Sequence, residues 1–363
     1  MPPIGLYVHV PFCLRKCDYC DFYSLPDLSL RDAFVAETAR RLAELDIRAD
    51  TLYFGGGTPS LLGERGIAAL LNAARPLLEP GCEITVEANP GDDLEGLIPS
   101  LASLGVNRLS LGMQSHDDAV LRRLSRRHSA ADVDRAVEAA LRSGIERLSL
   151  DVMIGTPGQT EESLLETLDY AAQCGADHIS AYLLKVEPGT PFARRREELS
   201  LPDEDEMARR YLLTVERLAA SGFAQYEISN FSRPGCRSRH NMKYWLDEPY
   251  LGFGPAAHSY FQGKRYYFPR DLASYLRGGS PVPDGEGGGL EEYAMLRLRL
   301  TDGLSRPDML SRYSEESDAV DAVWKRAERF RDSDLLRWRE DRLSLTPEGF
   351  LVSNALIAAL LVP

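Results

Sequence analysis

Hydrophobic and polar positions alternate between two periods along the first two-thirds of the chain. Short apolar runs typical of buried strands lie at 4–12, 51–54, 84–88, 107–111, 147–154 and 178–185. Apolar positions with a helical period lie at 30–45, 61–78, 130–143 and 203–221. Because parallel strands need a crossover connection, strands separated by helices of this length predict a parallel sheet built from β/α units.

The number of these units limits the shape of the sheet. Six predicted strands are fewer than the eight of a closed (β/α)8 barrel, so we expect an α/β fold with an open, partial (β/α)6 barrel. Polar and glycine-rich segments follow the predicted strands. They should therefore lie at the carboxyl edge of the sheet, where parallel α/β folds carry their functional sites.

The pattern changes after Phe231. Residues 232–289 are rich in aromatic residues, glycine and proline and show little periodicity, and 285–289 is expected to be a linker. From residue 290 the pattern is again helical, with an alternating segment at 335–345 that predicts a hairpin. Short helices with a hairpin resemble a winged-helix module, although no basic recognition helix is evident. We predict a core domain at 1–231, a connecting region at 232–289 and a C-terminal helical domain at 290–363.

Charge and composition exclude several classes of protein. The formal charge of −13, from 42 basic and 55 acidic residues, argues against general nucleic-acid binding. Three of the six cysteines lie within eight residues, which indicates a reducing compartment rather than a disulfide framework. The first residues lack a secretory pattern, and no apolar stretch reaches the roughly 18 residues of a membrane span. We expect a cytoplasmic protein that is not integral to a membrane.

The strongest chemical pattern is the spacing of Cys13, Cys17 and Cys20 in the loop after the first predicted strand. Thiolates are the usual ligands of iron–sulfur clusters. Three thiolates can hold three irons of a four-iron cube and leave the fourth iron open, the pattern of radical S-adenosylmethionine (SAM) proteins. A redox Cys-x-x-Cys pair or half of a zinc site is the alternative, but a structural zinc site needs further ligands. The other cysteines, Cys82, Cys174 and Cys236, are isolated.

Further polar residues follow the predicted strands. The run 55–59, Gly-Gly-Gly-Thr-Pro, would let the backbone approach a ligand closely, although alone it could be a tight turn. Glu87, Gln114 and Asp151 stand where apolar strands stop, and a carboxylate there can bind ribose hydroxyls or an amino group. Taken singly, each could equally cap a helix or lie in a solvated turn.

These motifs together resemble the oxygen-independent coproporphyrinogen III oxidase family of radical SAM proteins. The resemblance rests on Tyr7-x-His9-x-Pro11-Phe12-Cys13, the other two cysteines, the glycine run, Glu87-x-Asn89-Pro90 and 112–115, and it extends over nearly the whole chain. It implies a [4Fe–4S] cluster held by Cys13, Cys17 and Cys20, with SAM bound beside it. The residues that it implies near SAM are Tyr7, Tyr19, Gly56, Gly57, Thr58, Glu87, Gln114, Arg126 and Asp151.

Two features separate the branches of this family. The oxidases carry a fourth cysteine two residues after the third, where this chain has Phe22. The motif His240-Asn241-x-x-Tyr244-Trp245 is similar to that of the family's heme chaperones. Imidazole is a common axial ligand of heme iron, so His240 is the predicted heme ligand, with His258 as the alternative. The alternative interpretation of this motif is structural: His240 would cap a turn, and Tyr244 and Trp245 would fill the interface between domains.

The resemblance to the chaperone branch implies a protein that binds heme and passes it to a membrane acceptor, such as a respiratory cytochrome subunit, with membrane association during delivery. It implies a carrier rather than an enzyme, and it assigns no catalytic residue. One alternative is an oxidase that decarboxylates coproporphyrinogen III through a 5′-deoxyadenosyl radical, against which Phe22 argues. A second is radical SAM modification of tRNA, against which the negative charge argues.

Overall fold

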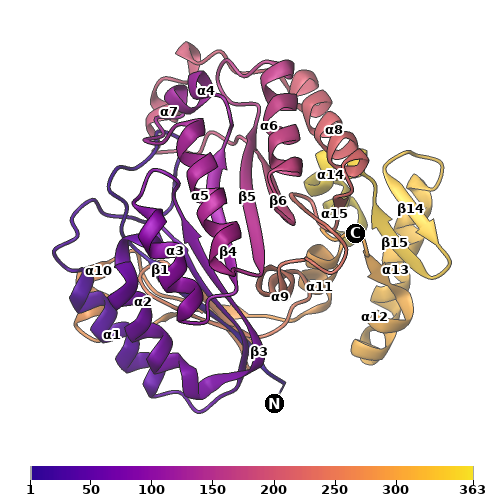
Figure 1. Cartoon of the computed structure of the whole chain (residues 1–363). Helices are drawn as coiled ribbons and strands as arrows, with labels where there is room; N and C mark the ends of the chain where they lie inside the picture. Colours follow the sequence, from indigo (N-terminus) through magenta and orange to yellow (C-terminus); the bar gives the residue numbers. More distant parts are fainter. Residues whose placement is uncertain (1, 363) are drawn as a thin grey trace.

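A mixed sheet of twelve strands forms the centre of the molecule in the computed structural model, which describes residues 2–362. Six consecutive strands of this sheet are parallel, and helices cover their outer face (Figure 1). These strands are β1 (Ile4–Val10), β2 (Ala49–Gly56), β3 (Leu78–Ala88), β4 (Arg108–Gln114), β5 (Arg147–Ile154) and β6 (His178–Leu183). The predicted partial (β/α)6 barrel is confirmed.

The outer helices combine predicted and unpredicted elements. Those expected from periodicity are α1 (Arg31–Ala43), α2 (Gly63–Ala74), α5 (Ala130–Ser143) and α8 (Glu204–Ala220). The bounds of α5 agree because Ser129 and Asp132 form a capping box and Gly144 ends the helix with φ of 84°. Three further helices were not predicted from the sequence: α3 (Leu94–Ser103), which contains Pro99, α4 (Asp118–Arg123) and α6 (Glu161–Gln173).

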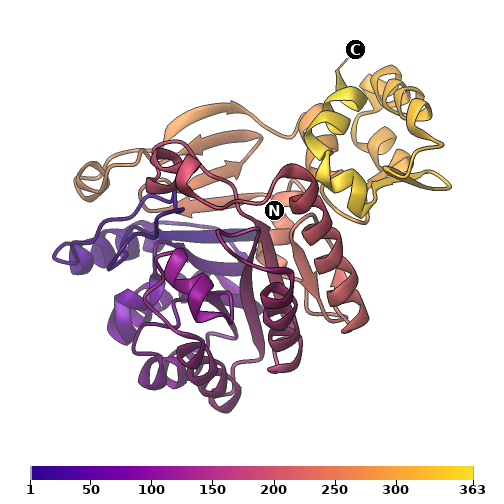
Figure 2. The same cartoon turned by 90° about the horizontal axis from the view of Figure 1, so that it is seen from above.

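The region without periodicity extends the sheet instead of forming a loop. Four short strands continue the sheet beyond β1, and β9 pairs with β1 in parallel (Figure 2, orange beside indigo). Strands of four or five residues offer too few positions to reveal a period. Gly285, expected in a linker, lies in the last of them. The elements are α9 (Arg239–Trp245), β9 (Tyr250–Phe253), β10 (His258–Phe261), β11 (Lys264–Tyr267), α10 (Leu272–Leu276) and β12 (Val282–Glu286).

The C-terminal part contains short helices and a three-stranded sheet. The predicted hairpin is present as β14 (Leu336–Arg339) and β15 (Arg342–Leu345), which turns at Glu340 with φ of 51°. The other elements are α11 (Leu290–Arg297), β13 (Leu304–Ser305), α12 (Arg306–Arg312), α13 (Ser317–Ala327), α14 (Pro347–Leu351) and α15 (Ser353–Leu361). This group stands to one side of the barrel (Figure 1, yellow).

The apolar core runs without a break from the barrel into this C-terminal part. Leu150 of β5, Phe231, Leu298 and Phe350 belong to one buried cluster, and a second cluster fills the space around β1, β2 and α1. Burial of apolar surface therefore ties the C-terminal helices to the sheet. Within residues 2–362, every helix is too short or too polar to cross a bilayer.

Candidate functional site

A cavity of about 330 Å³ opens at the carboxyl ends of the parallel strands. Its volume lies at the lower end of the range for small-molecule sites. Residues predicted from separate motifs meet in its wall, as expected for strand ends that share one edge of a parallel sheet. These residues are Cys13, Cys17, Tyr19, Cys20, Gly56, Gly57, Thr58, Glu87, Gln114, Arg126 and Asp151.

The cysteine loop is held against the glycine run by backbone hydrogen bonds. Gly57 N–H donates to the carbonyl of Val10 at 2.9 Å, and Cys13 N–H donates to that of Leu25 at 3.0 Å. The hydroxyl of Thr58 lies 3.5 Å from Cys13 Sγ, and all three thiols are free. Among the described residues no three ligands converge on one metal ion, whereas each thiolate of a cluster would bind a different iron.

Arg126 brings a positive charge to the thiols. Its Nη1 lies 3.5 Å from Cys17 Sγ and 3.4 Å from the Tyr19 hydroxyl, and its Nη2 donates to the carbonyl of Gly112 at 2.6 Å. Burial alone would lower the pKa of Arg126, but attraction to Tyr19 and Cys17 outweighs burial and raises it. A nearby cation favours the thiolate form that binds iron. The buried Nε of Arg126 has no partner among residues 2–362, so the protein's own acceptors leave the guanidinium of this cavity-lining residue incompletely satisfied.

Two carboxyl groups, one from β3 and one from β5, line the cavity. Glu87 accepts hydrogen bonds from the Tyr53 hydroxyl at 2.7 Å and from Gly56 N–H at 3.2 Å. Burial, followed by the negative charge of Asp151, raises the pKa of Glu87 to about 7. Burial likewise raises the pKa of Asp151 to about 6. Both groups therefore titrate near neutral pH, and a bound cation would favour their ionised forms.

Gln114 reaches the cavity through an unusual backbone conformation. Its φ is 66°, and the pairing of β4 with β5 shifts register between Leu111 and Gln114. Non-glycine residues seldom adopt this left-handed region, and such conformations cluster at functional sites. The neighbouring Gly112 leaves room for the Gln114 and Arg126 side chains, since a Cβ there would lie 3.2 and 3.1 Å from them.

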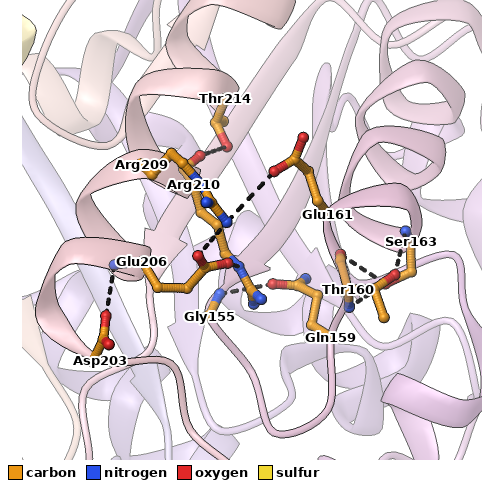
Figure 3. Close-up of polar contacts among 10 residues, drawn as sticks. All are labelled: Gly155, Gln159, Thr160, Glu161, Ser163, Asp203, Glu206, Arg209, Arg210 and Thr214. Carbon is orange, nitrogen blue, oxygen red and sulfur yellow. Dashed lines mark hydrogen bonds and ion pairs between the residues drawn. The ribbon is translucent and has the colours of Figure 1, made fainter.

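A polar network fixes the loop that follows β5 (Figure 3). The Gln159 side chain accepts from Gly155 N–H at 2.7 Å and donates to the carbonyl of Met153 at 2.9 Å. Arg209 of α8 forms an ion pair with Glu161 of α6, with 3.7 Å between Arg209 Nη2 and Glu161 Oε2, and this pair links the two helices. This network holds the end of β5, which carries Asp151 and Met153 into the cavity.

Tyr7 lies behind the cavity wall instead of lining it. Its hydroxyl is 3.2 Å from His9 Nδ1, and its ring would be 3.1 Å from a Cβ at Gly55. Burial raises the pKa of Tyr7, so the phenol stays neutral. Tyr7 thus supports the strand that leads into the glycine run.

The structure places His240 away from the cavity, at the amino ends of β1 and β2. Its side chain is 1% exposed, with Nδ1 2.8 Å from the Thr51 hydroxyl and Nε2 2.8 Å from the Tyr244 hydroxyl. Its ring stacks on Tyr53 at 5.1 Å, and burial lowers its pKa to about 3. In this conformation neither ring nitrogen is open to heme iron. Ligation by His240 stays a prediction that would require α9 to move.

Several residues of the cavity wall were not predicted from the sequence. Tyr182 is the penultimate residue of β6, so it could have been predicted from its place near a strand end, as Glu87 and Asp151 were. Phe22, noted only as a replaced cysteine, stands at the cavity with 62% of its side chain exposed. Three further lining residues belong to the sequence motifs but were given no individual role: Pro59, Asn89 and Gly112. The lining residues that no motif marked are Ala88, Ser110 and Met153.

Comparison with known proteins identifies the family of this site. The radical SAM superfamily matches residues 7–171, and the HemN C-terminal domain matches residues 289–352. Heme chaperone HemW of Mycobacterium tuberculosis is 39% identical over 99% of this chain and 95% of that protein. Heme chaperone HemW of Bacillus subtilis is 33% identical over 98% of each chain. The chain belongs to the HemW family.

A solved structure shows the same fold as this HemW-family chain. Escherichia coli coproporphyrinogen III oxidase, HemN, superimposes with a TM-score of 0.84 over 99% of this chain and 90% of its own, at 21% identity. The radical SAM domain implies a [4Fe–4S] cluster and SAM. The cavity suits both groups, since it combines three free thiols, a guanidinium with an unpartnered Nε and two carboxyls that could bind an amino group.

Proposed function

We propose that this chain holds a [4Fe–4S] cluster and SAM in its carboxyl-edge cavity, binds heme and delivers it to a heme-accepting membrane protein. The observation that carries the proposal is the full-length similarity to proteins named heme chaperones. The cavity supports the cofactor part, because all three cysteines and the strand-end polar groups line it. Cytoplasmic location and transient contact with a membrane are part of the same proposal, as is the division at 231 and 289.

Each group of the cavity has a distinct role in this proposal. Cys13, Cys17 and Cys20 would hold the cluster, and Arg126 would offset part of the thiolate charge. Glu87 and Asp151 would orient the amino and ribose groups of SAM, while Gly56 and Gly57 allow its close approach. The cluster and SAM, when bound, supply one-electron chemistry. The exposed Phe22 offers an apolar face at the opening.

The surroundings of the histidines separate two candidate heme ligands. Five of the six imidazole rings form a hydrogen bond within the described chain. His258 of β10 is exposed, and its ring has no hydrogen-bond partner among residues 2–362. Its ring stacks only on Tyr267, at 5.5 Å. Since a heme ligand needs a free ring nitrogen, we infer that His258 binds the iron more readily than the sequence-predicted His240.

A parallel assay tests the proposed function. Protein reconstituted with its cluster without oxygen is titrated with hemin, and the same preparation is incubated with coproporphyrinogen III and SAM. We expect a saturable shift of the heme absorption band and no protoporphyrinogen IX. Absence of heme binding would refute the chaperone proposal, and steady protoporphyrinogen formation would make the chain an oxidase despite Phe22.

Replacement of single histidines tests the ligand. His258→Ala should shift the heme absorption band and weaken heme binding by about tenfold, the loss of roughly 1.4 kcal/mol. The matched control is His116→Ala, because His116 is half-buried and hydrogen-bonded to Asp134 at 3.0 Å. If the heme absorption band is lost in His240→Ala and is unchanged in His258→Ala, the result would support the sequence prediction that His240 is the heme ligand. Iron content of the cluster should be equal in all variants.

A further inference from the structure

A second cavity, of about 410 Å³, lies between the end of α11 and the hairpin of β14 and β15. Four arginines line it, together with Thr301, Asp302 and Ser344, and it shares no lining residue with the cysteine cavity. The hairpin forms the outer edge of the C-terminal part (Figure 1). The arginines are Arg297, Arg337, Arg339 and Arg342.

The strand register explains why three of these arginines share one face. Side chains alternate along a strand, so Arg337 and Arg339 project to the same side of β14. Arg339 pairs with Arg342, and Arg337 pairs with Ser344, across the antiparallel ladder. The opposite face carries leucines such as Leu343, which is fully buried in the core. Because the leucine face of the hairpin must pack against the core, the arginine face is turned toward the cavity.

The positive charge of this cavity is poorly balanced by the protein itself. Within residues 2–362, Arg337 and Arg339 form no ion pair, and Arg342 has only Asp308 at 3.9 Å. The single acid of the wall, Asp302, is already paired with Arg237 at 2.8 Å. Like charges opposite each other on a ladder destabilise it, as at Arg339 and Arg342. The chain as a whole carries a charge of −13, so this concentration of cations is local.

One further observation distinguishes the cavity from a solvated surface. The Nε of Arg297 is buried and has no hydrogen-bond partner within the described chain. A buried donor without an acceptor is costly, so the protein's own acceptors leave the guanidinium of Arg297, which lines the cavity, incompletely satisfied. Guanidinium groups bind phosphate and carboxylate oxygens in pairs, with strong charge-assisted hydrogen bonds.

We propose that this arginine cavity binds a phosphate group, carried either by a small soluble compound or by an anionic lipid headgroup. Arg337, Arg339 and Arg342 supply the fork-shaped donors, and Arg297 closes the inner end. The site is separate from the cofactor cavity and independent of the proposed heme function.

The test uses the full-length, cluster-reconstituted protein. Inorganic pyrophosphate is titrated by calorimetry, and binding to phosphatidylcholine vesicles with or without phosphatidylglycerol is measured by co-sedimentation. The variant Arg337→Gln with Arg339→Gln removes two exposed cations, so it should fold normally. The matched control, Arg65→Gln with Arg196→Gln, removes the same charge from exposed arginines elsewhere.

Wild type and control should bind at least one probe, and the cavity variant should bind it about tenfold more weakly. The thermal stability of the cavity variant should be equal to that of wild type or slightly higher, because Arg339→Gln removes the like-charge pair with Arg342. Binding of pyrophosphate identifies a soluble phosphate ligand, and binding only to phosphatidylglycerol vesicles identifies a headgroup. Failure of wild type to bind either probe overturns the proposal. Equal weakening in the control also overturns it, since the effect would then reflect net charge alone.

Discussion

At the scale of single residues, burial sets the charge state of the cavity. Glu87 has an ordinary pKa of 4.5, which burial and Asp151 raise to about 7 in the folded chain. The folded state therefore binds more protons than the unfolded state between these values. The stability contributed by the neutral carboxyl is complete below pH 4.5 and is lost as pH rises through about 7.

The first prediction follows from this proton binding. In the cluster-free chain, the free energy of unfolding in urea should fall between about pH 5 and pH 8, and Glu87→Gln should remove roughly 2–3 kcal/mol of that fall. The control Glu138→Gln changes an exposed carboxylate that pairs with Arg142 and should leave the profile unchanged. A Glu87→Gln profile that follows wild type would show that Glu87 titrates normally.

Gly57 illustrates what the sequence could and could not predict about a residue. Its position after a strand correctly placed it in the cavity wall. The sequence interpretation assigned its bare backbone to ligand contact, but a Cβ at Gly57 would lie 2.4 Å from the carbonyl oxygen of Phe12. That clash depends on how β1 and β2 pair, which no local pattern reveals.

The second prediction is that Gly57→Ala displaces the start of the cysteine loop. Iron content after reconstitution should fall together with SAM affinity, because the clash is with the backbone next to Cys13. Gly96→Ala is the control, since Gly96 lies in α3 with open space around a Cβ. If Gly57→Ala instead keeps its full iron content but binds SAM weakly, the result would support the sequence interpretation that the Gly57 backbone contacts the ligand directly.

At the scale of elements, α9 shows why a motif recognised in the sequence does not reveal where it lies in the fold. The sequence marked His240, Tyr244 and Trp245 but held no sign that Glu83 of β3 would receive the first N–H groups of α9. Glu83 accepts from Arg239 N–H at 3.1 Å and His240 N–H at 2.9 Å. A carboxylate at a helix N-terminus is stabilising, so this long-range contact locks the motif at the base of the barrel.

The third prediction uses Glu83 to loosen α9. Glu83→Gln should lower the free energy of unfolding by about 1–2 kcal/mol, because charge-assisted hydrogen bonds to a helix end are lost. Glu79→Gln, which breaks an exposed pair with Arg48, should have little effect. Heme affinity should stay unchanged if His258 is the ligand. An increase in heme affinity in Glu83→Gln would indicate that a released His240 binds the iron.

At the scale of the whole molecule, the parallel arrangement of six strands was predictable from the alternation of strand and helix patterns. This arrangement places the residues at the carboxyl ends of the strands in one cavity wall. The four strands from β9 to β12 were not predictable, because their pairing depends on the exposed edge of β1. The continuous core from β5 to Phe350 also joins segments far apart in sequence. Long-range packing, rather than local preference, determines both features.

The central claim is that Cys13, Cys17 and Cys20 hold one four-iron cluster whose open iron SAM completes. The most direct measurement is the electron paramagnetic resonance spectrum of the reduced, reconstituted protein before and after addition of SAM. We predict a cluster signal that changes with SAM in wild type and in the control Cys174→Ala with Cys236→Ala, and no signal when the three cysteines are alanine. A cluster signal that survives in the triple variant, or that SAM leaves unchanged in wild type, would contradict the account.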